Sequence, residues 1–159
     1  MWKTGHSLVK EKLKTEHAAL AGEMSGHIFF ADGFFGFDDA VYAALRLLRI
    51  LAAANRPLSS LLADVPRTFS TPEIRVDCPD ERKFEVVAAL TAAFKARHEV
   101  IDVDGMRVNY PDGWGLLRAS NTQPVLVLRF ESLSPEGLER IRGEIVGELK
   151  RYPFVVVPT

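Results

Sequence analysis

The second half of the chain has a regular rhythm of short apolar runs, and this rhythm restricts the fold more than any other feature of the sequence. "EIRVDC" (73–78) alternates apolar and polar residues, as a strand with one covered face does. "PDERKFEVVAALTAAFKAR" (79–97) then starts with a proline and acidic residues, as a helix N-terminus prefers. "EVIDVDGMRVNYP" (99–111) predicts two strands joined at Asp104-Gly105, because this dipeptide favours a tight hairpin turn.

Two further strands and a closing helix complete the pattern. Apolar runs at 114–120 and 124–132 predict a second pair of strands. The segment 134–152 predicts a helix capped by Ser134, with Pro135 at its first position. The predicted order is β-α-β-β-β-β-α. We therefore expect an α+β domain in which two helices cover one face of an antiparallel sheet.

The first half has α/β character with few strands. Residues 5–17 predict a short surface helix, and "AAL" and "HIFF" predict strands on either side of a polar loop. "FDDAVYAALRLLRILAAANRP" (37–57) predicts a longer helix. The spacing of its apolar residues predicts that Val41, Leu45 and Leu48 face a core.

Composition narrows the function classes. A formal net charge of −1 offers no basic field for nucleic acid or for an anionic membrane surface. The longest apolar run is interrupted by Arg46 and Arg49 and is too short to span a bilayer, and the first residues lack the apolar core of a targeting signal. The single cysteine, Cys78, allows no internal disulfide and is expected to be a small buried side chain. We therefore expect a cytoplasmic protein with no nucleic-acid or membrane partner.

A cluster of polar residues, "RASNTQP" (118–124), lies between two apolar runs. Ser, Asn and Thr are favoured in turns for their own backbone hydrogen bonds, so an ordinary hairpin loop is one interpretation. The other is a phosphate site, because a guanidinium fork, two hydroxyls, an amide and turn N–H groups can converge on a tetrahedral dianion. Both interpretations stay open on residue types alone.

A second polar loop lies in "AGEMSGHIFF" (21–30), where Glu23, Ser25 and His27 are interspersed with glycines. A carboxylate in such a loop can accept hydrogen bonds from two vicinal hydroxyls, which is how proteins often hold a sugar. Taken singly, a solvated acid and a structural histidine are the simpler interpretations. The grouping of all three favours a binding role.

Three motifs resemble, in order, those of the α-D-phosphohexomutases, in particular the bacterial phosphomannomutase/phosphoglucomutase branch. They are "KTGHS" (3–7), "GEMSGH" (22–27) and "RASNTQPVLVLRFE" (118–131). The resemblance implies a four-domain enzyme that interconverts 1-phospho and 6-phospho sugars through a bisphosphorylated intermediate. It also implies a phosphoserine that donates and recovers the phosphoryl group with Mg²⁺.

The resemblance also implies roles for particular residues. Glu23 and Ser25 match the loop that holds the 3- and 4-hydroxyls of the sugar, which glucose and mannose share. His6 matches a substrate-contacting histidine, and His27 is a candidate for proton transfer or for orienting the substrate. The loop that grips the phosphate not being transferred is matched by Arg118, Ser120, Asn121 and Thr122.

Departures from the family pattern limit what the chain can do. Phosphoglucosamine mutases typically have Gln in place of Met24 and Gly in place of Asn121, so the phosphomannose/phosphoglucose branch is favoured. The phosphoserine loop and the aspartate-rich Mg²⁺ loop are absent from the sequence. Asp102 and Asp104 do not replace the latter, because they belong to a predicted hairpin turn and are too few for a cation cage. We expect no metal ligand and no assured catalytic group in this chain.

The chain is accordingly predicted to be the end of domain 3 (residues 1–68) followed by domain 4 (residues 69–159) of such an enzyme. In this hypothesis it binds a mannose or glucose phosphate, works with the N-terminal domains of the same enzyme and is inactive alone. The alternative hypothesis is a stand-alone, non-catalytic module that binds a sugar phosphate or a protein. The preferred sugar does not follow from these residues, since they match contacts common to both epimers.

Overall fold

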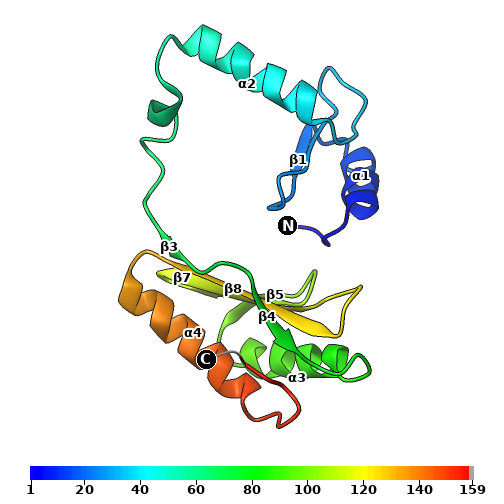
Figure 1. Cartoon of the computed structure of the whole chain (residues 1–159), viewed down its shortest axis with the longest axis vertical. Helices are drawn as coiled ribbons and strands as arrows, with labels where there is room; N and C mark the ends of the chain where they lie inside the picture. The colour runs from blue at the N-terminus through cyan, green and yellow to red at the C-terminus, as the bar shows by residue number, and fades with distance from the viewer. Residues whose placement is uncertain (158–159) are drawn as a thin grey trace. The chain divides into compact units, whose positions relative to one another are not determined.

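The computed structural model describes residues 1–157, and these divide into two units. Unit 1 comprises residues 1–65, and unit 2 starts at Pro66. The boundary predicted between residues 68 and 69 lies close to this division. Figure 1 shows helices α1 and α2 of the first unit in blue and cyan, and the sheet of the second unit in green to yellow. No helix within residues 1–157 is both long and apolar enough to cross a membrane.

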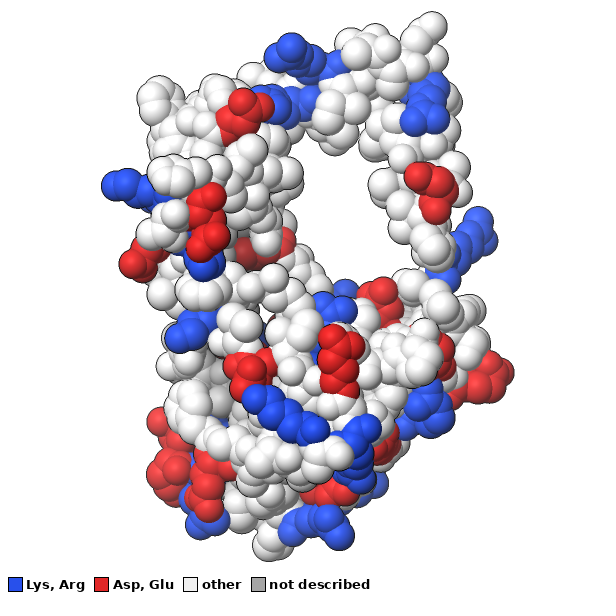
Figure 2. Space-filling view, turned by 180° about the vertical axis from the view of Figure 1, so that it is seen from behind, with Lys and Arg blue, Asp and Glu red and all other residues white. Residues whose placement is uncertain are grey.

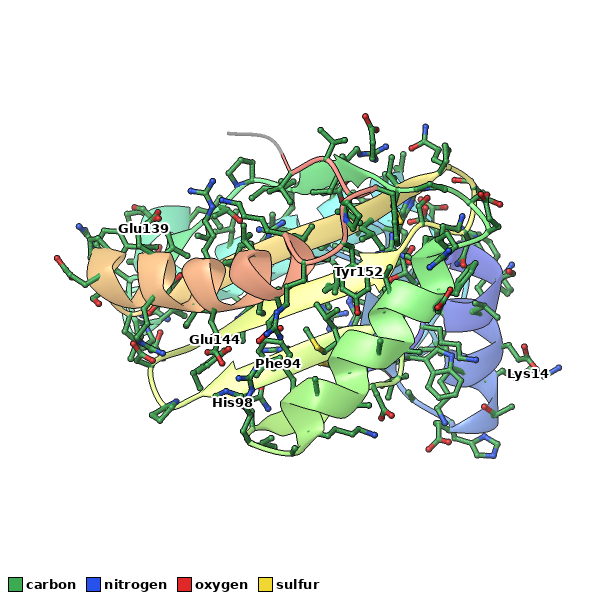
Figure 3. All side chains as sticks on the ribbon, turned by 90° about the horizontal axis from the view of Figure 1, so that it is seen from below. Lys14, Phe94, His98, Glu139, Glu144 and Tyr152 are labelled. Carbon is green, nitrogen blue, oxygen red and sulfur yellow. The ribbon has the colours of Figure 1, made fainter. Side chains whose placement is uncertain are left out.

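Unit 2 is built on a six-stranded sheet whose neighbouring strands are all antiparallel. Its strands are β3 (Phe69–Ser70), β4 (Ile74–Asp77), β5 (Glu99–Ile101), β6 (Met106–Tyr110), β7 (Gly113–Ala119) and β8 (Val125–Ser132). The order is β3-β8-β7-β6-β5, and β4 also pairs with β8. Two helices, α3 (Lys83–Lys95) and α4 (Pro135–Leu149), lie across one face of this sheet, as Figure 3 shows. The predicted α+β architecture is confirmed; the short β3 is an addition.

The core of unit 2 lies between this sheet face and the two helices. Alternate residues of the central strands turn inward, and one stripe of each helix meets them. The fully buried members include Val76, Val86, Phe94, Met106, Leu117, Leu126, Leu128, Phe130, Ile141, Ile145 and Leu149. Each such side chain contributes roughly 1.5–3 kcal/mol relative to exposure. Cys78 is buried in this core, as predicted.

Local sequence signals explain where the elements of unit 2 start and turn. Ser134 caps α4, its hydroxyl accepting a hydrogen bond from the Gly137 N–H at 3.0 Å, with proline next in the chain. Gly105 has φ +84° in the turn between β5 and β6. A Cβ added at Gly105 would lie 2.5 Å from the Leu117 carbonyl oxygen, so the turn requires glycine both for its conformation and for its close approach to β7.

Unit 1 has a much smaller core. Its elements are α1 (His6–Thr15), β1 (Leu20–Gly22), β2 (Ile28–Phe30), α2 (Ala40–Ala54) and a 3₁₀ turn (Leu58–Ser60). β1 and β2 form a two-stranded antiparallel sheet. Val9, Leu13 and Phe29 are buried together, with Ala18 and Ala21 packed against them. This cluster joins α1 to the hairpin.

The prediction that α2 faces a core is wrong for this chain. Val41, Leu45 and Leu48 are 71%, 58% and 59% exposed, and no residue of α2 is buried. The helix itself forms as expected, because Asp39 caps it by accepting from the Tyr42 N–H at 2.8 Å. Periodicity specified the apolar stripe, but the described part of unit 1 has only two short strands and so provides no layer wide enough to cover it.

The turn of the β5–β6 hairpin provides a stability prediction. Gly105→Ala should lower the free energy of unfolding by about 1–3 kcal/mol, because the new methyl group meets backbone atoms in a left-handed conformation. Gly143→Ala, within α4 and with nothing near its added Cβ, should instead stabilise by roughly 0.5–1 kcal/mol. Thermal melting of both variants checks this. Equal melting temperatures for the two would contradict the role of Gly105.

Glu144 on α4 makes hydrogen bonds to the turn after α3 and to β6, in the region labelled in Figure 3. His98 Nε2 lies 2.9 Å from one carboxylate oxygen, and the Tyr110 hydroxyl donates to the other at 2.9 Å. Burial raises the pKa of Glu144, but these two hydrogen bonds and the positive charges of His98 and Arg97 outweigh it and leave the pKa below its ordinary value of 4.5. The Tyr110 pKa is raised by burial and by the adjacent carboxylate.

This network predicts a pH dependence of stability. Because the pKa of Glu144 is lower folded than unfolded, its stabilisation is present above the unfolded pKa and is lost as the pH falls through the folded pKa. Between about pH 5 and pH 3, the native chain should therefore lose stability more steeply than Glu144→Gln. Denaturant unfolding at a series of pH values measures this. Glu139→Gln, at a side chain 69% exposed on the same helix, serves as the control and should keep the native slope.

Candidate functional site

The first polar loop forms a tight turn between β1 and β2. The Glu23 N–H donates to the His27 carbonyl at 2.9 Å, and the Gly26 N–H donates to the Glu23 carbonyl at 3.0 Å. Gly26 has φ +94°, which glycine adopts without strain. The Glu23 carboxylate accepts a hydrogen bond from the Gly5 N–H at 2.9 Å, so it is directed toward the start of α1. Ser25 is exposed on the same turn.

The two predicted histidines meet at one carboxylate. Asp38, just before α2, lies with Oδ2 2.6 Å from His27 Nδ1 and 3.6 Å from His6 Nε2. Its other oxygen accepts from the Ile28 N–H at 3.2 Å. The His6 ring also packs edge-on against the buried Phe29, with ring centroids 4.9 Å apart. The structure thus brings together His6, Glu23 and His27 and adds Asp38, which sequence reasoning did not assign to the site.

Asp38 controls which nitrogen of His27 carries the proton. The hydrogen bond to His27 lowers the pKa of Asp38; burial opposes this, and the Ile28 N–H and electrostatic attraction to the two imidazoles add to the lowering. An ionised carboxylate only accepts hydrogen bonds, so Nδ1 must be the protonated nitrogen of a neutral His27. Nε2 then keeps its lone pair and can accept a proton from a bound hydroxyl.

The second polar loop follows β7 in unit 2. Ser120 is buried, and its hydroxyl accepts from the N–H groups of Thr122 at 3.3 Å and Gln123 at 3.2 Å. The side chain thereby closes the turn, as the simpler interpretation of this loop requires. Its own O–H proton is still a possible donor to a ligand. Asn121 and Thr122 are exposed.

Arg118 precedes this loop at the end of β7. Its Nη1 lies 3.7 Å from Asp104 Oδ2, and its side chain is 20% exposed. The hairpin turn that contains Gly105 thus places the Asp104 carboxylate beside Arg118, the residue predicted to bind phosphate. A groove of about 420 Å³ adjoins the loop, lined by Asn121 together with α3 and this hairpin turn. On the face shown in Figure 2, basic and acidic side chains are interspersed.

Lys83, at the start of α3, holds the far end of the loop. Its side chain is only 3% exposed, and Nζ donates to the Gln123 carbonyl at 3.0 Å and pairs with Asp80. A buried lysine is rare unless it is paired, and this one has both a carboxylate and a carbonyl as partners. Sequence reasoning missed it, because a lysine in a charged helix start looks like a solvated residue.

Arg129 is a further basic residue near the loop that sequence reasoning missed. β7 and β8 pair Arg118 with Val127 and Leu116 with Arg129, so Arg118 and Arg129 are diagonal neighbours on the sheet face opposite the helices. Within the described residues, Arg129 Nε is buried with no hydrogen-bond partner. The sequence signal that could have identified Arg129 is its position within the motif "RASNTQPVLVLRFE" (118–131).

Two family descriptions match the chain, one over each of the two polar loops. The family description "Phosphoglucomutase/phosphomannomutase, alpha/beta/alpha domain III" matches residues 1–69, and "Phosphoglucomutase/phosphomannomutase, C-terminal domain" matches residues 73–148. The two polar loops therefore lie in consecutive domains of one class of protein, the phosphohexomutases. The chain belongs to the phosphoglucomutase/phosphomannomutase family and corresponds to its C-terminal part.

Individual relatives agree with this assignment. The chain is 51% identical over 152 residues to a phosphomannomutase/phosphoglucomutase of Pseudomonas syringae pv. tomato, covering 95% of this chain and 33% of that protein. It is 45% identical over 161 residues to a phosphoglucomutase of Neisseria gonorrhoeae, covering 99% of this chain and 35% of that protein. A crystal structure of a phosphoglucomutase/phosphomannomutase family protein from Burkholderia thailandensis matches with TM-score 0.84 and 50% identity, over 95% of this chain and 32% of that one. The chain thus spans about a third of the length of these relatives.

The buried lysine provides a prediction about the loop. Lys83→Met should increase amide hydrogen exchange at residues 120–125, because the Gln123 carbonyl loses its charged donor and keeps only the Val125 N–H, a loss worth about 1.5–3 kcal/mol. Lys95→Met is the matched control, on the same helix with a side chain 48% exposed. Unchanged exchange at residues 120–125 in Lys83→Met would show that the loop does not depend on this lysine.

Proposed function

We propose that this chain is the substrate-binding C-terminal portion of an enzyme that interconverts hexose 1-phosphate and 6-phosphate through a bisphosphate intermediate. The observation that carries the proposal is the placement of the two polar loops, each held in a defined turn within a domain of the matching family. The relatives named phosphomannomutase/phosphoglucomutase support mannose and glucose phosphates as the substrate class.

The loop of unit 1 is proposed to hold the sugar. Glu23 would accept hydrogen bonds from the 3- and 4-hydroxyls, with Ser25 beside it on the turn and His6 as a further contact. The Gly5 N–H supports this role for Glu23, because it occupies one carboxylate oxygen at 2.9 Å and fixes the direction of the other. Since glucose and mannose share these two hydroxyls, one loop can serve both.

His27 is the proposed proton-transfer or orienting group. Phosphoryl transfer to a sugar hydroxyl releases the proton of that hydroxyl, and a base within hydrogen-bond reach has to accept it. The hydrogen bond from Nδ1 to Asp38 leaves His27 Nε2 as such a base. Asp38 would also stabilise the imidazolium that forms. We therefore assign Asp38 as a positioning residue.

The loop of unit 2 is proposed to grip the phosphate that is not being transferred. Arg118 would supply a planar fork that meets two phosphate oxygens, and the side chains of Ser120, Asn121 and Thr122 would supply directional donors. Binding energy gained at this phosphate would position the other end of the sugar for chemistry. The ion pair with Asp104 is long, at 3.7 Å, so an incoming phosphate can compete for the guanidinium.

The chemical step is proposed to need domains outside this sequence. The relatives fit a metal-dependent enzyme in general, and we infer that Mg²⁺ and a phosphoserine act from the N-terminal domains of a cytoplasmic enzyme. Within the described residues, the group able to hold an ion is His6, His27 and Asp38. Two imidazole nitrogens do not fit Mg²⁺, which takes oxygen ligands, so no step here is routed through it. The chain alone should bind without turnover.

Arg118 provides the test of this function. In an enzyme that contains this sequence, Arg118→Lys should lower kcat/KM for mannose 1-phosphate by roughly one to two decades, because losing a charge-assisted contact costs about 1.5–3 kcal/mol. The melting temperature should barely change, since the residue covers little core. Arg142→Lys on α4 is the matched control and should keep full activity. Unchanged kcat/KM in Arg118→Lys would remove the loop from the phosphate site.

A further inference from the structure

Three side chains of unit 1 converge on one point with donor atoms that suit a transition metal. His6 comes from the start of α1, His27 from just before β2 and Asp38 from just before α2. One ligand atom of each lies within 4.8 Å of the other two. We propose that this His–His–Asp cluster binds a divalent transition metal such as Zn²⁺, at a site different in chemistry from the Mg²⁺ site of the family.

The distances are close to those of a zinc site. Zinc holds nitrogen and carboxylate ligands at about 2.0–2.2 Å in tetrahedral geometry, so two of its ligand atoms are roughly 3.3 Å apart. Asp38 Oδ2 lies 3.6 Å from His6 Nε2 and 2.6 Å from His27 Nδ1. The first pair needs almost no movement, and the second has to open. The side chain of His27 is 47% exposed, so its ring can move by this amount.

Neighbouring contacts orient two of the three ligands, as the outer partners of a metal site do. The Ile28 N–H holds Asp38 Oδ1 at 3.2 Å, which leaves Oδ2 directed toward both imidazoles. Phe29 is fully buried and packs against the His6 ring, which restricts the rotation of that ring. A metal would therefore meet a carboxylate and one imidazole that are already in place.

The donor set selects against magnesium. Two imidazole nitrogens with one carboxylate oxygen suit Zn²⁺, Co²⁺, Ni²⁺ and Cu²⁺, whereas Mg²⁺ demands an octahedron of oxygens and gives up its water reluctantly. Three protein ligands leave a coordination position open to water or to a substrate oxygen. Millimolar Mg²⁺ should thus leave the site available to Zn²⁺.

Metal binding would change what His27 can do. A metal on Nδ1 needs the lone pair of that nitrogen, so the single ring proton of neutral His27 moves from Nδ1 to Nε2. His27 could no longer accept a proton there. This consequence, inhibition of the mutase by Zn²⁺, rests on the proposed function, whereas binding itself does not.

The test is direct metal binding by the purified chain, with no activity measurement. Isothermal titration with Zn²⁺ should show one site per chain, unaffected by millimolar Mg²⁺. Asp38→Asn and His27→Ala should each weaken binding by about tenfold or more. His17→Asn, at an exposed histidine outside the cluster, is the control and should bind as the native chain does. Circular dichroism verifies that each variant is folded.

A second measurement needs no variant. Paramagnetic Co²⁺ should broaden the imidazole NMR signals of two histidines at low metal concentration and leave those of His17 sharper. Absence of Zn²⁺ binding, or equal binding by the native chain, Asp38→Asn and His27→Ala, would overturn the proposal, as would equal broadening of all four histidines. Any of these results leaves the proposed function standing, because that depends on the Arg118 kinetics.

Discussion

The antiparallel pairing of β7 with β8 is the interaction on which most of unit 2 depends. Seven residue pairs join the two strands, from Gly113 with Ser132 to Ala119 with Leu126, and both β3 and β4 attach to β8. Because side chains alternate along a strand, this register puts Leu117 in the core and Arg118 on the opposite face. A slip by one residue would exchange the two, so the hydrophobic effect that fixes the core also fixes where the guanidinium points. The polar loop begins where this pairing ends.

Unit 1 is held in a different way. Its core consists of three buried side chains, so the geometry of its polar residues depends more on hydrogen bonds to particular atoms than on packing. The Gly5 N–H directs Glu23, and Asp38 links the imidazoles to the N–H of Ile28. The bonds from the Gly5 and Ile28 N–H groups join residues that are 18 and 10 positions apart. The histidines are therefore placed by the same contacts that close α1 and α2 onto the hairpin, and any change to those contacts acts on the candidate site.

The contrast between the units also explains what the sequence could predict. Signals that act within a few residues were sufficient for the Asp104-Gly105 turn, the Ser134 cap and the alternating strands, and the structure confirms them. The sequence did not predict the positions of Lys83, Asp38 and Arg129 in the candidate site. These positions depend on hydrogen-bond partners or strand neighbours that are 10 or more residues away. The error at α2 has a similar origin. An apolar stripe on a helix indicates a face that packs against another element. Whether such an element is present depends on the rest of the fold.

The two proposed roles of Asp38, positioning His27 and binding a metal, exclude each other for a geometric reason. A hydrogen bond brings its oxygen to 2.6 Å from His27 Nδ1, whereas two ligands of one zinc ion are roughly 3.3 Å apart. The carboxylate therefore cannot hold the proton of Nδ1 and share a metal with it at the same time. A proton on Nδ1 directs the lone pair of the ring outward through Nε2, and a metal on Nδ1 directs an N–H outward instead. The same three side chains would thus present either an acceptor or a donor to a bound sugar hydroxyl, and the availability of the metal decides which.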